Sequence, residues 1–243
     1  MIDNILIYNS GGGIGDSIQI LRLIETLKSE LKDTNFSYLS AHNNHFNLSL
    51  KDYKCQINSL DLNVKYFGFR WWHALIVKKE IKKKNISKFD LIIDLQSKIR
   101  NSLILKTIPH KYFISSSLNF KLSKPSLSVK KDKKINYTIL KSINLLFKKN
   151  YQLAEFDINK IDKKIFDESK RLLPKNNYVG FSITQGNIYR KKHWPIEKVV
   201  KISDEIIKLN KIPVFFVEKK YQELKNTIKN LIPTALFPEH ETN

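Results

Sequence analysis

Residues 4–27 read NILIYNSGGGIGDSIQILRLIETL. The compact apolar run at the start predicts a buried strand, and the glycine-rich stretch after it predicts a tight turn. Apolar residues then recur at helical spacing, at Ile20, Ile24, Leu27 and Leu31, which predicts an amphipathic helix. A strand, a glycine turn and a helix in this order are typical of the first unit of a parallel α/β sheet, where ligand oxygens can approach the backbone at the helix N-terminus.

The rest of the chain alternates between strand-like runs and helical patterns. Strands are expected at 36–40, 63–67, 89–95, 111–114, 178–183 and 212–217. Helices are expected at 72–84, 97–106, 135–148, 161–173, 195–206 and 221–231. This alternation predicts an α/β fold with parallel sheets. We expect two domains, 1–174 and 175–243. The second has only two expected strands, so it is expected to be incomplete, with its last strand presenting an unpaired edge.

The chain is strongly basic. Its 243 residues include 43 basic and 23 acidic side chains, for a formal net charge of +20. Such an excess attracts nucleic acid, anionic lipid headgroups or phosphorylated substrates, although a lysine-rich solvated surface would give the same count. No apolar run reaches the roughly 18 to 20 residues that span a bilayer. Cys55 is the single cysteine, so no internal disulfide can form and a reducing cytoplasm is the simplest setting.

The glycine turn matches neither common phosphate-binding motif. No Gly-Lys-Ser/Thr follows it, and its spacing departs from G-x-G-x-x-G. Asp16 stands where a phosphate would otherwise lie. A carboxylate there opposes a dinucleotide and suits a general base acting on a sugar hydroxyl. The alternative is that Asp16 or Ser17 only caps the helix.

Three stretches, in the same order, resemble the conserved boxes of the glycosyltransferase family 9 heptosyltransferases. Residues 5–27 contain a Gly-x-Gly-Asp turn after a strand; residues 89–105, FDLIIDLQSKIRNSLIL, contain Asp-Leu-Gln followed by a basic residue; and residues 180–195, GFSITQGNIYRKKHWP, contain Lys-x-Trp-Pro. The resemblance implies a GT-B fold of two Rossmann-like domains, the first for the acceptor and the second for an ADP-sugar. It also implies inverting, metal-independent transfer of heptose to the lipopolysaccharide inner core, with ADP-heptose as donor substrate and no cofactor.

The resemblance assigns roles to residues of the acceptor side. Asp16 matches the base that deprotonates the acceptor hydroxyl, and Gly13 and Gly15 would let the turn approach the sugar. Arg100 matches the basic residue after Asp-Leu-Gln. Its guanidinium would pair with an acceptor phosphate or carboxylate.

On the donor side, Lys192 matches the lysine that neutralises the leaving diphosphate, and Thr184 matches a phosphate-binding hydroxyl. A family glutamate that contacts the nucleoside aligns with either Glu218 or Glu223. The family's last box, an Asp-Ser/Thr-Gly-Pro-x-His loop, has no match in the chain. We therefore expect a C-terminally truncated member of the family, and the activity of this chain alone stays open.

Four other side chains have simpler interpretations. Asp94 is expected to cap the helix that follows it. One of Trp71 and Trp72 is expected to pack in the core, although a membrane interface or a cover over the acceptor site would also suit the pair. Trp194 is likewise expected to pack. The histidines lack the spacing of zinc ligands, so no metal is expected.

Together these features predict a monomeric enzyme, peripheral on the inner face of the inner membrane. Its partners would be a nucleotide-sugar, a lipid A–core acceptor and the anionic membrane surface. One alternative is an inactive remnant of such an enzyme. Another is a basic α/β protein that binds nucleic acid, suggested by charge alone because no basic stripe interleaved with aromatic residues is visible. No nucleic-acid partner is therefore expected.

Overall fold

The computed structural model describes residues 2–10, 13–40, 43–53, 55–130, 132–184 and 194–239. The chain divides into two compact units, Met1–Ile161 and Asp162–Asn243. The boundary expected after residue 174 is therefore one helix too late, because α5 (Lys163–Leu172) belongs to the second unit. The sequence signal there, Pro174, marks the end of that helix and not the join between the units.

The first unit is built on a five-stranded sheet in the order β3-β2-β1-β4-β5, with every pairing parallel. The strands are β1 (Asn4–Asn9), β2 (Asn35–Ser40), β3 (Asn58–Ser59), β4 (Phe89–Asp94) and β5 (His110–Ser115). This is the strand order of a Rossmann-like unit with β1 at its centre.

The third strand was expected at 63–67, and this is wrong. Strand β3 lies earlier and is only two residues long, pairing with Ser37 and Tyr38 of β2. Asn63 and Tyr66 have left-handed backbone conformations, with φ of 53° and 52°, which end any extended run. Phe67 packs onto the sheet from this loop, so its apolar character reflects burial and not strand structure.

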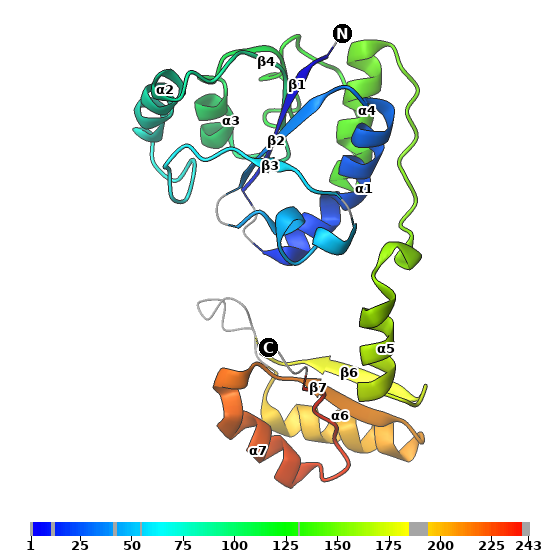
Figure 1. Ribbon diagram of the computed structural model, residues 1–243. Helices are drawn as coiled ribbons and strands as arrows, with labels where there is room; N and C mark the ends of the chain where they lie inside the picture. Colours follow the sequence, from blue (N-terminus) through cyan, green and yellow to red (C-terminus); the bar gives the residue numbers. More distant parts are fainter. Residues whose placement is uncertain are drawn as a thin grey trace. The chain divides into compact units, whose positions relative to one another are not determined.

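Helices cover both faces of this sheet (Figure 1). Helices α1 (Ile14–Glu30) and α4 (Ile135–Phe147) lie on one face, and α2 (His73–Lys83) and α3 (Ile99–Leu105) lie on the other. Short 3-10 turns occur at His45–Asn47, Lys51–Tyr53 and Ile158–Lys160. Helices α2, α3 and α4 fall within two residues of the expected ranges, and α1 carries the apolar positions predicted from Ile20 to Leu27.

Strand β1 is buried on both faces, which explains its continuous apolar run. Ile5 and Ile7 join the core cluster that contains α1 and α4, and Leu6 and Tyr8 join the cluster that contains α2 and α3. Successive side chains of a strand point to opposite faces, and the central strand of a parallel sheet is covered on both. This strand therefore ties both helical layers to one sheet.

The second unit repeats the same β-α-β pattern on a smaller scale. Its elements after α5 are β6 (Tyr178–Ser182), α6 (Ile196–Lys208), β7 (Ile212–Phe216), a 3-10 turn (Lys219–Tyr221) and α7 (Gln222–Leu231). Strands β6 and β7 are parallel neighbours. The expected unpaired edge at the last strand is wrong: Leu236 bridges Val214 in parallel on the side of β7 away from β6.

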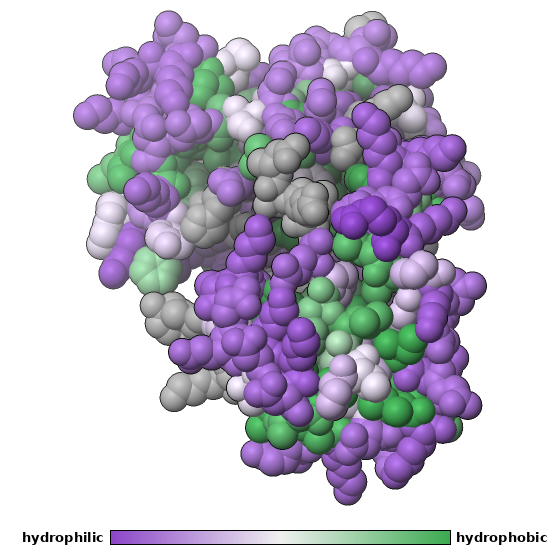
Figure 2. Space-filling view, turned by 60° about the horizontal axis from the view of Figure 1, so that its bottom comes forward, coloured by the Kyte–Doolittle hydropathy of each residue, from purple (hydrophilic) through white to green (hydrophobic). Residues whose placement is uncertain are grey.

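The surface is mainly hydrophilic, as Figure 2 shows for the visible face. No helix within the described ranges combines the length and apolarity needed to cross a bilayer. Trp71 and Trp72 are 60% and 56% exposed, so the expectation that one of them packs in the core is wrong. Both precede the first turn of α2, and His73 takes the buried position there instead.

Candidate functional site

The first two sequence boxes meet at one edge of the first sheet. Strands β1 and β4 are parallel neighbours, with Tyr8 opposite Asp94, so the segments that follow them leave the sheet side by side. Gln96 Nε2 donates to Asn9 Oδ1 at 3.2 Å, and Asn9 Nδ2 donates to the backbone oxygen of Asp16 at 3.3 Å. Hydrogen bonds therefore connect the Asp-Leu-Gln segment to the first turn of α1.

Asp16 is exposed in the first turn of α1. The residue at the N-cap is Gly13, which makes no side-chain cap hydrogen bond, and Ser17 is buried. Capping by either Asp16 or Ser17 is therefore not what the structure shows. The carboxylate lies at the positive end of the helix dipole, where a dinucleotide site would hold a phosphate. The buried Tyr38 has a raised pKa, chiefly because of burial, and the charge of Asp16 adds to that rise.

The glycines beside Asp16 leave open space. A methyl group at Gly15 would meet nothing within 4 Å, and one at Gly13 would meet only Asp16 Oδ2, at 3.5 Å. Gly13 has an extended backbone with φ −96°. Packing does not explain Gly15, because alanine is more favourable than glycine within a helix, whereas Gly13 is the N-cap, where glycine is common. Both glycines therefore leave the start of α1 uncrowded.

Arg100, on α3, is half-buried and fixed at the same edge. Its Nε donates to the carbonyl oxygen of Gly68, and its guanidinium carbon lies 5.8 Å from the Phe69 ring centroid. The side chain lines a small cavity of about 150 Å³ together with Ser10 and Lys98. Two cations at one cavity wall provide a place for an anionic group, and a guanidinium can bind a phosphate or carboxylate bidentately.

Gly68 orients Arg100 by accepting a hydrogen bond from it, and it was not among the site residues predicted from the sequence. Its φ is +78°, and a Cβ added there would lie 2.1 Å from Asn101 Oδ1. Asn101 is itself held by the Tyr8 hydroxyl, to which its Nδ2 donates at 2.8 Å. Only glycine fits this position. The available signal was an isolated glycine within an otherwise aromatic run, Tyr66–Arg70.

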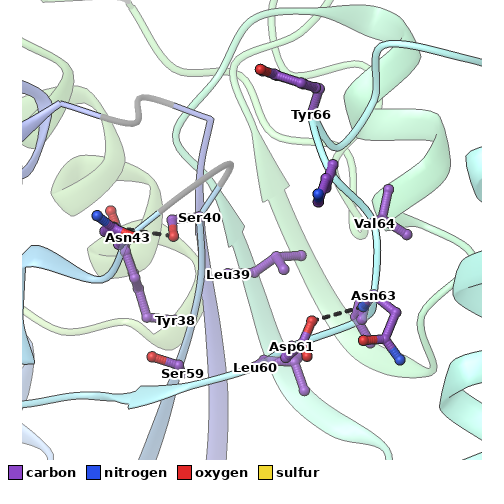
Figure 3. A pocket seen from close by; sticks show the side chains of 12 residues that line it. Tyr38, Leu39, Ser40, Asn43, Ser59, Leu60, Asp61, Asn63, Val64 and Tyr66 are labelled. Atoms are coloured by element: carbon purple, nitrogen blue, oxygen red, sulfur yellow. Dashed lines mark hydrogen bonds between the residues drawn. The ribbon is translucent and has the colours of Figure 1, made fainter.

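A larger cavity of about 680 Å³ lies at the carboxyl ends of β2 and β3. Figure 3 shows its lining side chains on these two strand ends and on the turn that follows β3. The backbone NH of Asn63 donates to Asp61 Oδ1 at 2.7 Å, which holds that turn. Tyr66 borders both this cavity and the one lined by Arg100. The volume is in the range of small-molecule sites, and its residues carry no motif that the sequence could reveal.

Asp94 lies beneath this edge in a buried hydrogen-bond network. Its carboxylate accepts from the backbone NH of Gln96 at 2.9 Å and from the hydroxyls of Ser102 and Ser115. The N-cap of α3 is Lys98, so the expectation that Asp94 caps this helix is wrong. Burial raises the pKa of Asp94 to about 6, although these hydrogen bonds lower it. We interpret Asp94 as a positioning residue for the segment that carries Gln96.

In the second unit, two predicted donor residues meet at one sheet edge. Thr184 follows the carboxyl end of β6 and Glu218 follows that of its parallel neighbour β7, which is where nucleotides bind in such sheets. Glu218 Oε2 lies 2.6 Å from Lys220 Nζ. Glu223 is exposed in the first turn of α7, further along the chain. Lys192 lies outside the described residues.

An apolar cavity of about 410 Å³ lies beside β6, lined in part by Phe181, Ile202 and Trp194. Trp194 is 62% exposed, so the expectation that it packs is wrong: it stands just before α6 and forms a wall of the cavity instead. Within the described ranges, no group of three or more His, Cys, Asp or Glu side chains could hold a metal ion.

Comparisons with solved structures show the class of fold. The chain is similar to a family 9 glycosyltransferase from Veillonella parvula, with a TM-score of 0.58 and 18% identity over 98% of this chain and 71% of that one. It is similar to the E. coli heptosyltransferase WaaC with ADP-2-deoxy-2-fluoro heptose, with a TM-score of 0.63 and 12% identity over 96% and 75%. It is also similar to a UDP-GlcNAc 2-epimerase from Methanocaldococcus jannaschii, with a TM-score of 0.53 and 13% identity over 100% and 74%.

The chain thus has the α/β fold of GT-B proteins, as the resemblance implied. Neither a protein-family model nor a curated protein sequence matches it.

Two glycine substitutions should have different effects on stability. Gly68→Ala should lower the free energy of unfolding by about 1–3 kcal/mol, because it adds both backbone strain and a clash. Gly15→Ala, the matched control, should leave stability unchanged or raise it by up to about 1 kcal/mol. Chemical denaturation measures both. Equal effects of the two substitutions would show that the environments described here are wrong.

The Asp94 carboxyl should make stability depend on pH. Its folded pKa of about 6 lies above the unfolded value of about 3.9, so the folded chain retains the proton between roughly pH 4 and pH 6. The stabilisation is present below about pH 4 and is lost as pH rises through about 6, by about 3 kcal/mol. Asp94→Asn should remove this dependence. If the free energy of unfolding changes equally with pH in the two proteins between pH 4 and pH 7, this prediction is wrong.

Proposed function

We propose that this chain is a glycosyltransferase that moves a heptose, or a related sugar, from an ADP-sugar to a lipopolysaccharide core acceptor. One observation carries the proposal. The exposed carboxylate of Asp16 lies beside the open space at Gly13, 3.5 Å from where a methyl group there would stand. The backbone oxygen of the same residue is connected by hydrogen bonds to the segment that leads to Arg100. A base and an anion-binding cation at one sheet edge suit a hydroxylated, negatively charged acceptor.

The proposed reaction is a single displacement without a metal. Asp16 takes the proton of the acceptor hydroxyl as its oxygen attacks the anomeric carbon of the donor sugar. A new bond forms between that oxygen and the anomeric carbon, and the bond from this carbon to the diphosphate breaks. Attack opposite the leaving group inverts the anomeric centre. Arg100 holds the acceptor by its phosphate or carboxylate, and Gly13 and Gly15 give it access.

The second unit is proposed to bind the nucleotide. Thr184 follows the end of β6, where a hydroxyl can donate to a phosphate, and Lys192 would neutralise the departing diphosphate. Of the two candidate glutamates, Glu218 is the better placed for the nucleoside, because it shares a sheet edge with Thr184. Glu223 stays the alternative.

The fold does not determine the reaction, because epimerases that act on UDP-GlcNAc share it. The proposal therefore rests on the site residues. The acceptor would be a lipid A–core oligosaccharide, and the enzyme would work as a monomer at the anionic inner face of the inner membrane. Nucleic-acid binding is a weaker alternative that only the charge of +20 supports. A second alternative is a protein that keeps the fold and the site residues but has lost the transferase activity.

The base role of Asp16 predicts a selective loss of turnover. Asp16→Asn should lower kcat about 10²–10⁴-fold while ADP affinity, measured by calorimetry, stays nearly unchanged. Asp33→Asn, an exposed aspartate of the same unit, is the matched control and should retain activity. ADP release from ADP-heptose in the presence of a lipid A–core acceptor measures turnover. Normal turnover of Asp16→Asn would remove Asp16 from this role. An unmodified chain that binds ADP-heptose but never releases ADP would favour the inactive alternative.

The donor site predicts different effects of two neighbouring glutamates. Glu218→Gln should weaken ADP binding by about tenfold, the equivalent of one charge-assisted hydrogen bond, and Lys192→Ala should weaken ADP-sugar binding further. Glu223→Gln, the paired control, should bind ADP normally. Calorimetric titration measures all three. If Glu223→Gln weakens binding and Glu218→Gln does not, the assignment is reversed. If the unmodified chain binds neither ADP nor ADP-heptose, the ADP-sugar proposal fails.

A further inference from the structure

The loop from β3 to α2 and the start of that helix present large apolar side chains to solvent. Tyr66, Phe69 and Trp71 are each 60% exposed, Trp72 is 56% exposed and Leu75 is 70% exposed. We call these five residues the aromatic patch. Exposed apolar residues scattered singly are ordinary, but a contiguous group marks an interaction surface.

The aromatic patch stands on a buried base. Phe67 is 4% exposed and packs against the Tyr8 ring, with centroids 4.9 Å apart. Gly68 lies directly against Asn101, and His73 is buried at the start of α2. Buried and exposed residues therefore interleave along this segment, so the exposed rings are held in place by the fold.

Positive charge surrounds the aromatic patch. Residues 65–84 contain seven basic residues and one acidic residue, Glu80. Glu80 is buried, accepts a hydrogen bond from Asn63 Nδ2 at 2.7 Å and lies 3.7 Å from Lys84 Nζ. Its charge is therefore largely compensated, and Lys78 and Lys79 are exposed on the same helix. This surface is complementary to an anionic one.

Guanidinium groups lie near the rings of the aromatic patch. The Arg70 carbon is 5.0 Å from the Phe69 ring centroid and 5.3 Å from that of Trp72. Arg100 is 6.0 Å from the Trp71 ring centroid. Because the cations lie over the ring faces, the ring edges and the Leu75 side chain stay free to enter an apolar layer. The charges can then stay at the polar boundary of that layer.

We propose that the aromatic patch docks this chain on an anionic lipid bilayer, so that the cavity lined by Arg100 opens toward the lipid headgroups. Aromatic residues with neighbouring cations are typical of segments that lie at the membrane interface. A protein partner fits less well because lysine is depleted from protein interfaces. Single-stranded nucleic acid fits less well because Arg70 and Arg100 already lie over one face of these rings, which leaves fewer faces for base stacking.

The docking rests on the proposed function in one respect: a lipid-linked acceptor gives the enzyme a reason to lie at a membrane. Binding to the membrane does not itself require the transfer reaction. ADP binding and vesicle binding therefore test the two separately. A chain that binds ADP but no vesicles would refute only the docking. A chain that binds vesicles but no ADP-sugar would refute only the proposed reaction.

The test is co-sedimentation of the chain with vesicles of phosphatidylcholine alone or mixed with phosphatidylglycerol. Binding should require the anionic lipid and should weaken with added salt. The double substitution Trp71→Ala and Trp72→Ala should lower the partition coefficient on the order of tenfold. Leu75→Ser should lower it severalfold. Leu209→Ser, a control in the second unit with 72% exposure, should leave it unchanged. Circular dichroism confirms that each variant is folded.

A second readout uses the tryptophans directly. Trp194→Phe leaves only Trp71 and Trp72 as emitters, because the chain has three tryptophans. Their emission should shift to the blue when anionic vesicles are added. Several outcomes would overturn the proposal: no vesicle binding, no blue shift, or equal losses for Leu75→Ser and Leu209→Ser. If vesicles do not bind, binding of single-stranded DNA or self-association that depends on the aromatic patch would identify the partner of this surface instead.

Discussion

The parallel pairing of β1 with β4 is the constraint on which the first unit depends. Because both strands are central, their middle positions are buried and apolar, and their polar residues stand near the strand ends. The register places Tyr8 opposite Asp94. The turn after β1 and the segment after β4 therefore leave the sheet together, and Asn9 and Gln96 join them by hydrogen bonds. The carboxylate of Asp16 and the guanidinium of Arg100 reach one edge for this reason.

The carboxyl ends of the two parallel sheets differ in the charged groups that they carry. In the first unit, the N-terminus of α1 already holds the carboxylate of Asp16, so electrostatics disfavours a phosphate there. In the second unit, Thr184 and Glu218 follow neighbouring strands, the usual position for a nucleotide in a parallel sheet. This difference supports the proposal that the first unit binds the acceptor and the second unit binds the nucleotide.

Much of this fold could be predicted from the sequence because local patterns specify it. The apolar run of β1, the helical spacing in α1 and the repeated strand-helix alternation all depend on near neighbours. Strand β3 could not be predicted, since two residues that pair only through the backbone leave no apolar pattern. The candidate site could be predicted in part, but its function stays a proposal. Asp16 and Arg100 follow from their motifs, but the contact of Arg100 with Gly68 joins residues 32 positions apart. The exposure of Trp71 likewise depends on where α2 begins.

We propose that the nucleotide binds the second unit and not the glycine turn of the first. Backbone amide NMR of the isotope-labelled chain, titrated with ADP, tests it most directly. ADP should shift the amide resonances of Thr184 and Glu218 and leave those of Gly13, Gly15 and Asp16 unmoved. Shifts concentrated at Gly13, Gly15 and Asp16 would show that the turn binds phosphate as in a dinucleotide-binding protein, and would contradict the assignment of Asp16 as the base.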